Sequence, residues 1–209
     1  MTGTNQYDKY ILWNGITTGI QCMNTTLASG AILAKLNAVG NVSLMLYNYL
    51  GRDACGQAGG AAYAYYRGCA IKDNPQIHGA SANSLIIGST FMESIVSYLP
   101  IGGKLMFAPL VVANVGKNIG WIGTGAVNVH YMSNISKDNI AEMYTRMSVV
   151  NSFASTIGTM GGLALTRFTI TSPILGVGLC TALCVANKLS YNYMLNLVEP
   201  CKQVETPHV

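Results

Sequence analysis

The stretch LGRDACGQAGGAAYAYYRG, residues 50–68, is rich in glycine and alanine and carries the adjacent charges Arg52 and Asp53. Small residues at the spacing Gly56-x-x-x-Gly60 allow two helix backbones to approach closely, as helices in lipid often do. A charged pair in such a segment is costly unless it is buried and partnered, so it should face a protein interior. The stretch therefore predicts the packing centre of a small helical membrane protein.

The composition of the chain agrees with a membrane protein. Only 10% of the 209 residues are charged, against about 25% in typical soluble domains, and 50% are hydrophobic. The alternative is a soluble subunit buried inside a larger assembly. The net charge of +4 is small and the basic residues are scattered, so the sequence does not indicate a nucleic-acid partner.

Six apolar segments follow one another over residues 10–36, 41–66, 80–99, 105–132, 147–166 and 173–186. Five of them have 20–28 residues, enough for the roughly 20 that cross a bilayer as a helix, and the sixth has 14. No strand-type alternation persists in them. We predict an all-α fold, a compact integral membrane protein with about six hydrophobic helices. It forms a single domain over residues 1–209, with a polar lead over 1–9, helical spans over 10–186 and a C-terminal extension over 187–209.

Four ionisable residues fall inside these segments: Arg52, Asp53, Glu93 and Lys117. Charge within a membrane span is by default a functional-site hypothesis. Glu93 and Lys117 lie on neighbouring segments joined by a short connection, which makes an ion pair between them plausible. Three interpretations stay open: the charges satisfy one another between packed helices, they line a transport or proton path, or they snorkel from span ends.

Glycines spaced four apart recur along the chain and predict helix–helix contacts. The pairs are Gly56 with Gly60, Gly116 with Gly120, and Gly158 with Gly162.

Basic residues near the predicted span ends suggest a lipid contact. Arg67, Lys137 and Arg146 are candidates to hold the head groups of anionic phospholipid such as cardiolipin. Ordinary solvated loop charges are the alternative interpretation.

The sequence carries no motif typical of catalysis or of a metal site. The six cysteines lack metal-type spacing, and Cys180-x-x-x-Cys184 places two thiols on one helix face, where they are expected to pack as small hydrophobes. No phosphate-binding loop or Ser/His/Asp arrangement stands out. We therefore expect no catalytic residue, no metal and no cofactor.

Five short motifs give the chain a resemblance to a known family. They are Trp13-Asn14, Arg52-Asp53-Ala54-Cys55-Gly56, Glu93, Asn114-Val115-Gly116-Lys117 with Gly125-Ala126, and Asn139-Ile140-Ala141-Glu142 with Arg146 and Gly158. In this order they resemble the motifs of the root UVB sensitive family, also known by its vitamin B6 associated domain. The resemblance implies a multi-span protein of plastids or mitochondria that is tied to vitamin B6 homeostasis and has no established reaction.

The chain departs from the family pattern mainly at polar positions. Neutral or apolar residues stand where the resemblance leads one to expect acids, an arginine or a Gln-Glu pair, namely at Asn83, Ile87, Asn128, Val150 and Asn151. The small packing residues remain, which suggests a family member reused as a scaffold.

Three functions follow as hypotheses. The first is a structural or accessory subunit, without catalysis of its own, that works with other subunits of a large organellar membrane complex. Its predicted place is the mitochondrial inner membrane, with a plastid membrane as the alternative. The second is a small-molecule carrier that uses Asp53, Glu93 and Lys117. The third is a vitamin B6-related membrane enzyme with Lys117 as a Schiff-base lysine.

Overall fold

The computed structural model describes residues 2–38, 40, 42–67, 74–100, 103–135 and 140–197. Helices make up nearly all of these ranges, and no β-strand is found in them. The helices are α1 (Thr2–Ala38), α2 (Val42–Arg67), α3 (Pro75–Tyr98), α4 (Gly103–Ile135), α5 (Ile140–Thr169) and α6 (Pro173–Asn196). The predicted all-α fold with about six helices is confirmed.

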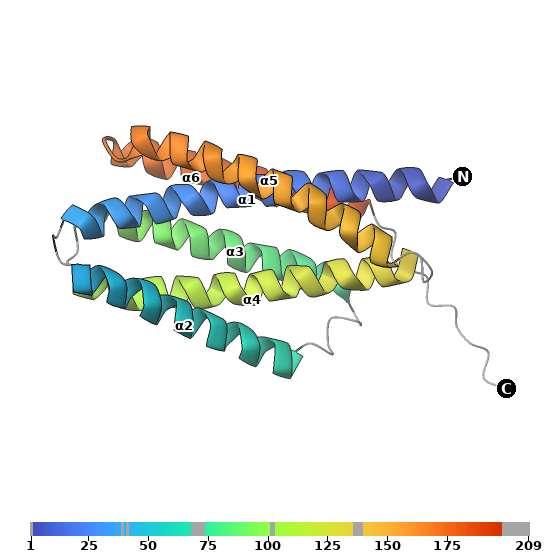
Figure 1. Ribbon diagram of the computed structural model, residues 1–209, viewed down its shortest axis with the longest axis horizontal. Coiled ribbons are helices and arrows are strands. Elements are labelled where there is room, and N and C mark those ends of the chain that lie inside the picture. Colours follow the sequence, from blue (N-terminus) through green and yellow to red (C-terminus); the bar gives the residue numbers. More distant parts are fainter. Residues whose placement is uncertain are drawn as a thin grey trace.

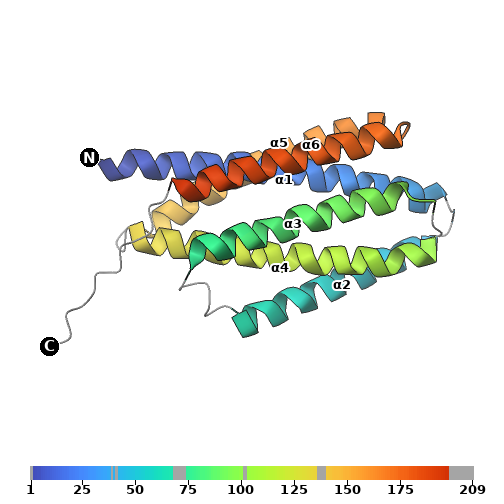
Figure 2. The same ribbon diagram turned by 180° about the vertical axis from the view of Figure 1, so that it is seen from behind.

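Consecutive helices run in opposite directions, so the chain passes back and forth through one elongated bundle (Figure 1). α5 and α6 pack on α1, α3 lies between this group and α4, and α2 packs on the outer side of α4. The view from behind gives the same order, with α2 furthest from α5 and α6 (Figure 2). α1 begins and α6 ends at the same end of the bundle, as an even number of passes requires.

Apolar clusters occupy three parts of the interior. An aromatic and methionine cluster near the start of α1 contains Tyr7, Tyr10, Tyr131, Met132, Tyr191 and Met194. A purely aliphatic and methionine cluster near the end of α1 contains Ile32, Leu36, Val96, Met106 and Leu110. A third cluster joins Leu27 of α1 to Cys180 and Cys184 of α6.

The helices extend beyond the predicted segments. α1 starts at Thr2, so the described part of the predicted polar lead is helical. Tyr7 and Tyr10 lie three residues apart and are 5% and 0% exposed, which places them on one buried helix face. α6 continues to Asn196, so the first ten residues of the predicted C-terminal extension belong to the helix.

Residues 133–146 separate two of the predicted apolar segments, yet their described part is helical, because α4 ends at Ile135 and α5 begins at Ile140. Two charged residues of α5 support the helix. Glu142 and Arg146 are four residues apart and form an exposed ion pair at 2.6 Å, the spacing at which opposite charges stabilise a helix.

Glycines mark the closest approaches between helices. A Cβ atom at Gly158 of α5 would collide with the backbone carbonyl of Gly19 in α1, and one at Gly162 would lie 2.6 Å from the carbonyl oxygen of Met23. A Cβ atom added at Gly120 of α4 would likewise lie 2.6 Å from the carbonyl oxygen of Ala82 in α3. Backbone atoms cannot swing aside as a flexible side chain can, so these positions require glycine.

The other predicted glycines face side chains. A Cβ atom at Gly56 of α2 would collide with the Asn114 amide, and one at Gly60 would lie 2.7 Å from Ile122. Gly116 faces the Ser89 hydroxyl of α3. The three glycine pairs thus lie at three different contacts: α2 with α4, α4 with α3, and α5 with α1.

We predict that Gly158→Ala lowers the free energy of unfolding by about 1–3 kcal/mol, because the added methyl group forces two backbones apart. Gly178→Ala is the matched control in α6, since a Cβ atom there meets no other atom within 4 Å. It should raise stability by about 0.5–1 kcal/mol through helix propensity alone. Thermal unfolding of the purified full chain in detergent measures both changes. Equal effects of the two substitutions would contradict the close contact between α1 and α5.

Candidate functional site

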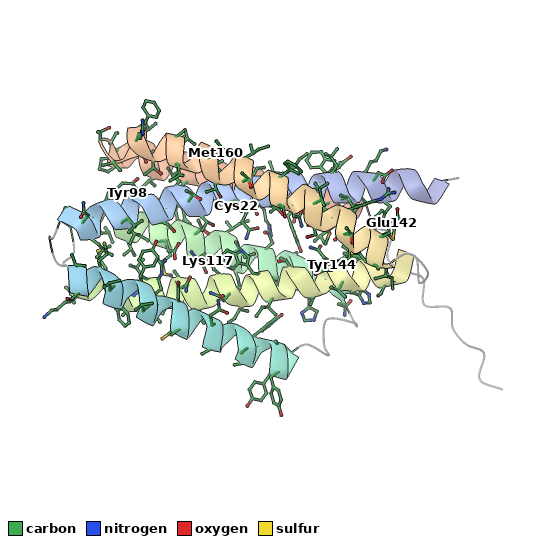
Figure 3. The ribbon with its side chains drawn as sticks, in the orientation of Figure 1. Cys22, Tyr98, Lys117, Glu142, Tyr144 and Met160 are labelled. Carbon is green, nitrogen blue, oxygen red and sulfur yellow. The ribbon has the colours of Figure 1, made fainter. Side chains whose placement is uncertain are left out.

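Three of the four charged residues predicted to lie in apolar segments meet in the interior. Glu93 of α3 is 0% exposed and accepts a hydrogen bond on Oε2 from Lys117 Nζ of α4 at 2.6 Å. Its other oxygen, Oε1, lies 3.6 Å from Nη1 of Arg52 in α2. We call Arg52, Glu93 and Lys117 the charge cluster. Figure 3 shows Lys117 inside the bundle, away from both ends.

Small neighbours bring the three helices close enough for this contact. Gly116 precedes Lys117 and lies directly against Ser89 of α3, one turn before Glu93. On α2, Gly56 follows Arg52 by one turn and lies against the Asn114 and Asn118 amides of α4. The glycines predicted to pack helices therefore also set the distance between the charges.

Further contacts hold Arg52 in place. Its guanidinium lies over the Tyr49 ring, 4.9 Å from the ring centroid, in a cation–π arrangement. Asn114 Nδ2 donates to the Arg52 carbonyl oxygen at 2.9 Å and to Asp53 Oδ1 at 3.2 Å. One α4 side chain thus fixes both the backbone and the charged edge of α2.

Asp53 does not lie in the interior with its neighbour. Its side chain is 58% exposed, although Oδ1 lies 3.9 Å from Nε of Arg52. The prediction that the adjacent pair faces a protein interior is therefore correct for Arg52 and wrong for Asp53. Successive residues of a helix point about 100° apart, so the two side chains cannot share one buried face.

The charge cluster is internally paired but not fully hydrogen-bonded. Two cations share one buried carboxylate, and Asp53 supplies a second negative charge from the surface. Arg52 Nε and Glu93 Oε1 have no hydrogen-bond partner in the described part of the chain. Removing one member of a buried ion pair strands the other charge away from water, which is far more destabilising than loss of a surface pair.

Lys117 does not fit the role of a Schiff-base lysine. Such a lysine needs a free amine that a carbonyl compound can reach. The Lys117 amine donates to Glu93 instead, and the residue is only 2% exposed. We therefore assign no step to a pyridoxal cofactor at this position.

The three basic residues predicted to hold lipid head groups do not form one described site. Arg67 ends α2 and is exposed, whereas Arg146 lies in α5 and is paired with Glu142 at 2.6 Å. Figure 3 places Glu142 near the end of the bundle where α1 begins. Lys137 lies outside the described residues. Within the described ranges, no three His, Cys, Asp or Glu side chains gather as metal ligands.

A second polar group, which motif reasoning missed, joins α1, α4 and α5. The Tyr10 hydroxyl donates to Asn128 Oδ1, and Asn128 Nδ2 donates to Asn14 Oδ1 at 3.3 Å. Asn14 Nδ2 in turn donates to Asn151 Oδ1 at 2.9 Å. Asn128 and Asn151 are two of the positions at which the chain departs from the family pattern. The signal was therefore present as isolated departures, but only the fold shows that these amides bond through Asn14.

The fold and the site define a bundle of six described helices with charged and polar side chains in its interior. The family described as the vitamin B6 photo-protection and homoeostasis domain matches residues 2–198. The chain belongs to this family, the UVB-sensitive proteins, as its motifs suggested. No curated protein and no solved structure matches the chain.

We predict that Glu93→Gln lowers the free energy of unfolding by about 3–5 kcal/mol, because it leaves buried Lys117 without its counter-charge and Arg52 with only the exposed Asp53. Glu142→Gln is the control: it breaks an exposed pair spaced four residues apart, worth about 0.3–0.5 kcal/mol. Adding Lys117→Met to Glu93→Gln should recover part of the loss. Thermal unfolding of the full chain tests all three variants. A loss at Glu93 no larger than that at Glu142 would contradict the pairing.

Proposed function

We propose that this family member is a non-catalytic helical membrane protein that serves as an accessory subunit of a larger membrane complex. The observation that carries the proposal is that each of the six described helices exposes large apolar side chains. The interior holds charged and amide side chains beside its apolar clusters.

Each helix contributes to the outward apolar surface. Among its most exposed members are Leu12 of α1 at 56%, Leu50 of α2 at 70%, Ile77 of α3 at 64%, Leu105 of α4 at 72%, Phe153 of α5 at 69% and Ile174 of α6 at 88%. Figure 3 shows Met160 on the outer side of α5, where it is 66% exposed. Large apolar side chains exposed on all six described helices agree with contact with lipid or with another protein.

Of the six helices in the described residues, two are long and apolar enough to cross a membrane: α4 over Lys104–Ser133 and α6 over Pro173–Asn196. A core helix of a soluble protein can pass the same test, but it would be mostly buried. Only 39% and 33% of the most apolar windows of these two helices are buried in the chain. This exposure favours an outer environment of lipid or partner subunits.

A structural role agrees with the state of the charge cluster. Glu93 and Lys117 neutralise one another at 2.6 Å, and Gly116 beside Lys117 and Gly56 beside Arg52 lie at tight helix contacts. For the membrane, we retain the mitochondrial inner membrane as the proposal, with a plastid membrane as the alternative implied by the family resemblance.

Extraction of the natural membrane tests the proposal in two steps. The full chain should stay in the membrane fraction after an alkaline carbonate wash. After mild detergent extraction it should migrate on a native gel with an assembly far larger than its own 22.2 kDa. Release by carbonate would contradict membrane embedding, and migration as a single chain would contradict the subunit role.

A carrier for a small anion is the second candidate function. The observation that favours it is that Arg52 and Lys117, two buried cations, share the single buried carboxylate of Glu93. Neutralising that carboxylate would leave positive charge available to an anion. Because the family description names vitamin B6, pyridoxal phosphate and inorganic phosphate are suitable probes.

Uptake into vesicles that contain the purified full chain separates the carrier from the subunit. If the chain is a carrier, the vesicles should take up labelled pyridoxal phosphate or labelled inorganic phosphate. Lys117→Met should reduce that uptake to the rate of protein-free vesicles. Arg146→Gln, which removes an exposed cation far from the charge cluster, should leave uptake unchanged. Background uptake by the unmodified chain would exclude the carrier function for these probes.

A further inference from the structure

A column of uncharged polar side chains runs along the inner face of α1, separate from the charge cluster. Tyr7, Tyr10, Asn14, Thr17 and Asn24 are between 0% and 5% exposed. Their spacing of three, four, three and seven residues keeps them on one face of the helix. We call these residues the polar column, together with Asn83 of α3, Asn128 of α4, Asn151 of α5, and Cys184, Asn187 and Ser190 of α6.

Cross-helix hydrogen bonds link the polar column at successive levels. The Thr17 hydroxyl donates to Ser190 Oγ of α6 at 3.1 Å. Asn187 Nδ2, also of α6, donates to the Thr17 carbonyl oxygen at 3.3 Å. Two turns further on, Asn24 Nδ2 donates to Cys184 Sγ at 3.1 Å. The amide group of Asn14, Asn128 and Asn151 occupies the level before Thr17.

The pairing of α3 with α6 places Asn83 at the level of Asn187. These helices are antiparallel: the Tyr191 hydroxyl lies against Gly79, and Cys184 Sγ donates to the Ile87 carbonyl oxygen at 3.8 Å. Asn83 lies between Gly79 and Ile87, and Asn187 lies between Tyr191 and Cys184. Both amides are buried, with 0% and 2% exposure.

Many polar atoms of this region have no hydrogen-bond partner in the described part of the chain. Within the described residues, hydrogen-bond partners are missing for both amide atoms of Asn83, for Oδ1 of Asn24 and Asn187, and for the hydroxyls of Tyr7, Thr25, Tyr131 and Tyr191. A buried polar atom without a partner costs about 1–3 kcal/mol. Native proteins contain few buried polar atoms without a partner, and a bound water molecule is one common explanation for them. Several such atoms close together therefore indicate that small hydrogen-bonding molecules bind here.

The polar column contains no charged residue in its described part. Lys188 of α6 follows Asn187 but is only half-buried, and it donates to Ser84 Oγ of α3 at 2.7 Å. The column side chains are amides, hydroxyls and thiols, which both donate and accept hydrogen bonds. Groups of this kind suit uncharged polar molecules and offer no counter-charge to an ion, which would lose its hydration on entry.

We propose that the polar column is a hydrated binding site for small uncharged polar molecules, with water as its basal occupant. It begins at the tyrosine-rich end near the start of α1 and reaches Cys184. This inference does not depend on the subunit role, because it concerns only the interior of one chain.

Brief X-ray radiolysis followed by mass spectrometry tests hydration in the intact full chain. Hydroxyl radicals form where water lies, so buried residues beside internal water are oxidised. Met132 and Met194, beside the tyrosines, and Met106, in the aliphatic cluster, are all between 0% and 1% exposed. Met132 and Met194 should be oxidised and Met106 spared, and Asn83→Leu with Asn187→Leu should remove that difference.

Equal protection of all three methionines would overturn the proposal, since it would show a dry column. Equal oxidation would also overturn it, because it would reflect general opening of the bundle. The measurement on the unmodified chain decides both outcomes even if the double variant does not fold.

Thiol labelling tests which molecules the column admits. Methyl methanethiosulfonate is small and neutral, and the sulfonatoethyl reagent delivers an anion by the same chemistry. Cys184 is 6% exposed, and exposed Cys55 of α2 is the internal control. The neutral reagent should modify both cysteines and the anionic reagent only Cys55. Failure of the neutral reagent at Cys184, or equal labelling by the anion, would overturn the assignment.

Discussion

The position of Glu93 is the constraint on which the helix arrangement depends. A carboxylate with no solvent exposure must find compensation inside the bundle, and Lys117 of α4 and Arg52 of α2 provide it. One α3 side chain therefore couples three helices, including α2, which packs mainly on α4. The glycines beside Arg52 and Lys117 are part of the same arrangement, because bulkier residues would hold the helices too far apart for these contacts.

The interior contains two kinds of polar chemistry. Around α2, α3 and α4 the polar groups are charged and mutually paired, with Asp53 as their exposed edge. Around α1 and α6 they are neutral amides, hydroxyls and thiols, many of which have no partner among the described residues. Paired charges resist rearrangement because each holds its neighbour, whereas neutral groups with free hydrogen-bonding capacity can exchange one small partner for another. This difference is why a structural role suits the first region and ligand binding suits the second.

Much of the charge cluster was predictable from sequence. Glu93 and Lys117 are isolated charges in adjacent apolar segments, and that pattern made their ion pair one of three open interpretations. The amides were not predictable in the same way, because Asn14, Asn128 and Asn151 are far apart in the chain and polar residues of this kind are common in helices. The polar appearance of residues 2–9 and 140–146 also concealed helical structure. Buried Tyr7 and Tyr10 are three residues apart and paired Glu142 and Arg146 are four apart, both of which are helical spacings.

The sequence by itself determined the helical class, the family and the ionisable residues that form the charge cluster, because these follow from composition, periodicity and local motifs. It also marked the small residues at which backbones approach. Only the tertiary structure decided that Asp53 turns outward while Arg52 turns inward, and that the Asn14, Asn128 and Asn151 amides bond to one another. Those outcomes depend on the rotation and register of each helix against its neighbours, which the spacing along one chain does not specify.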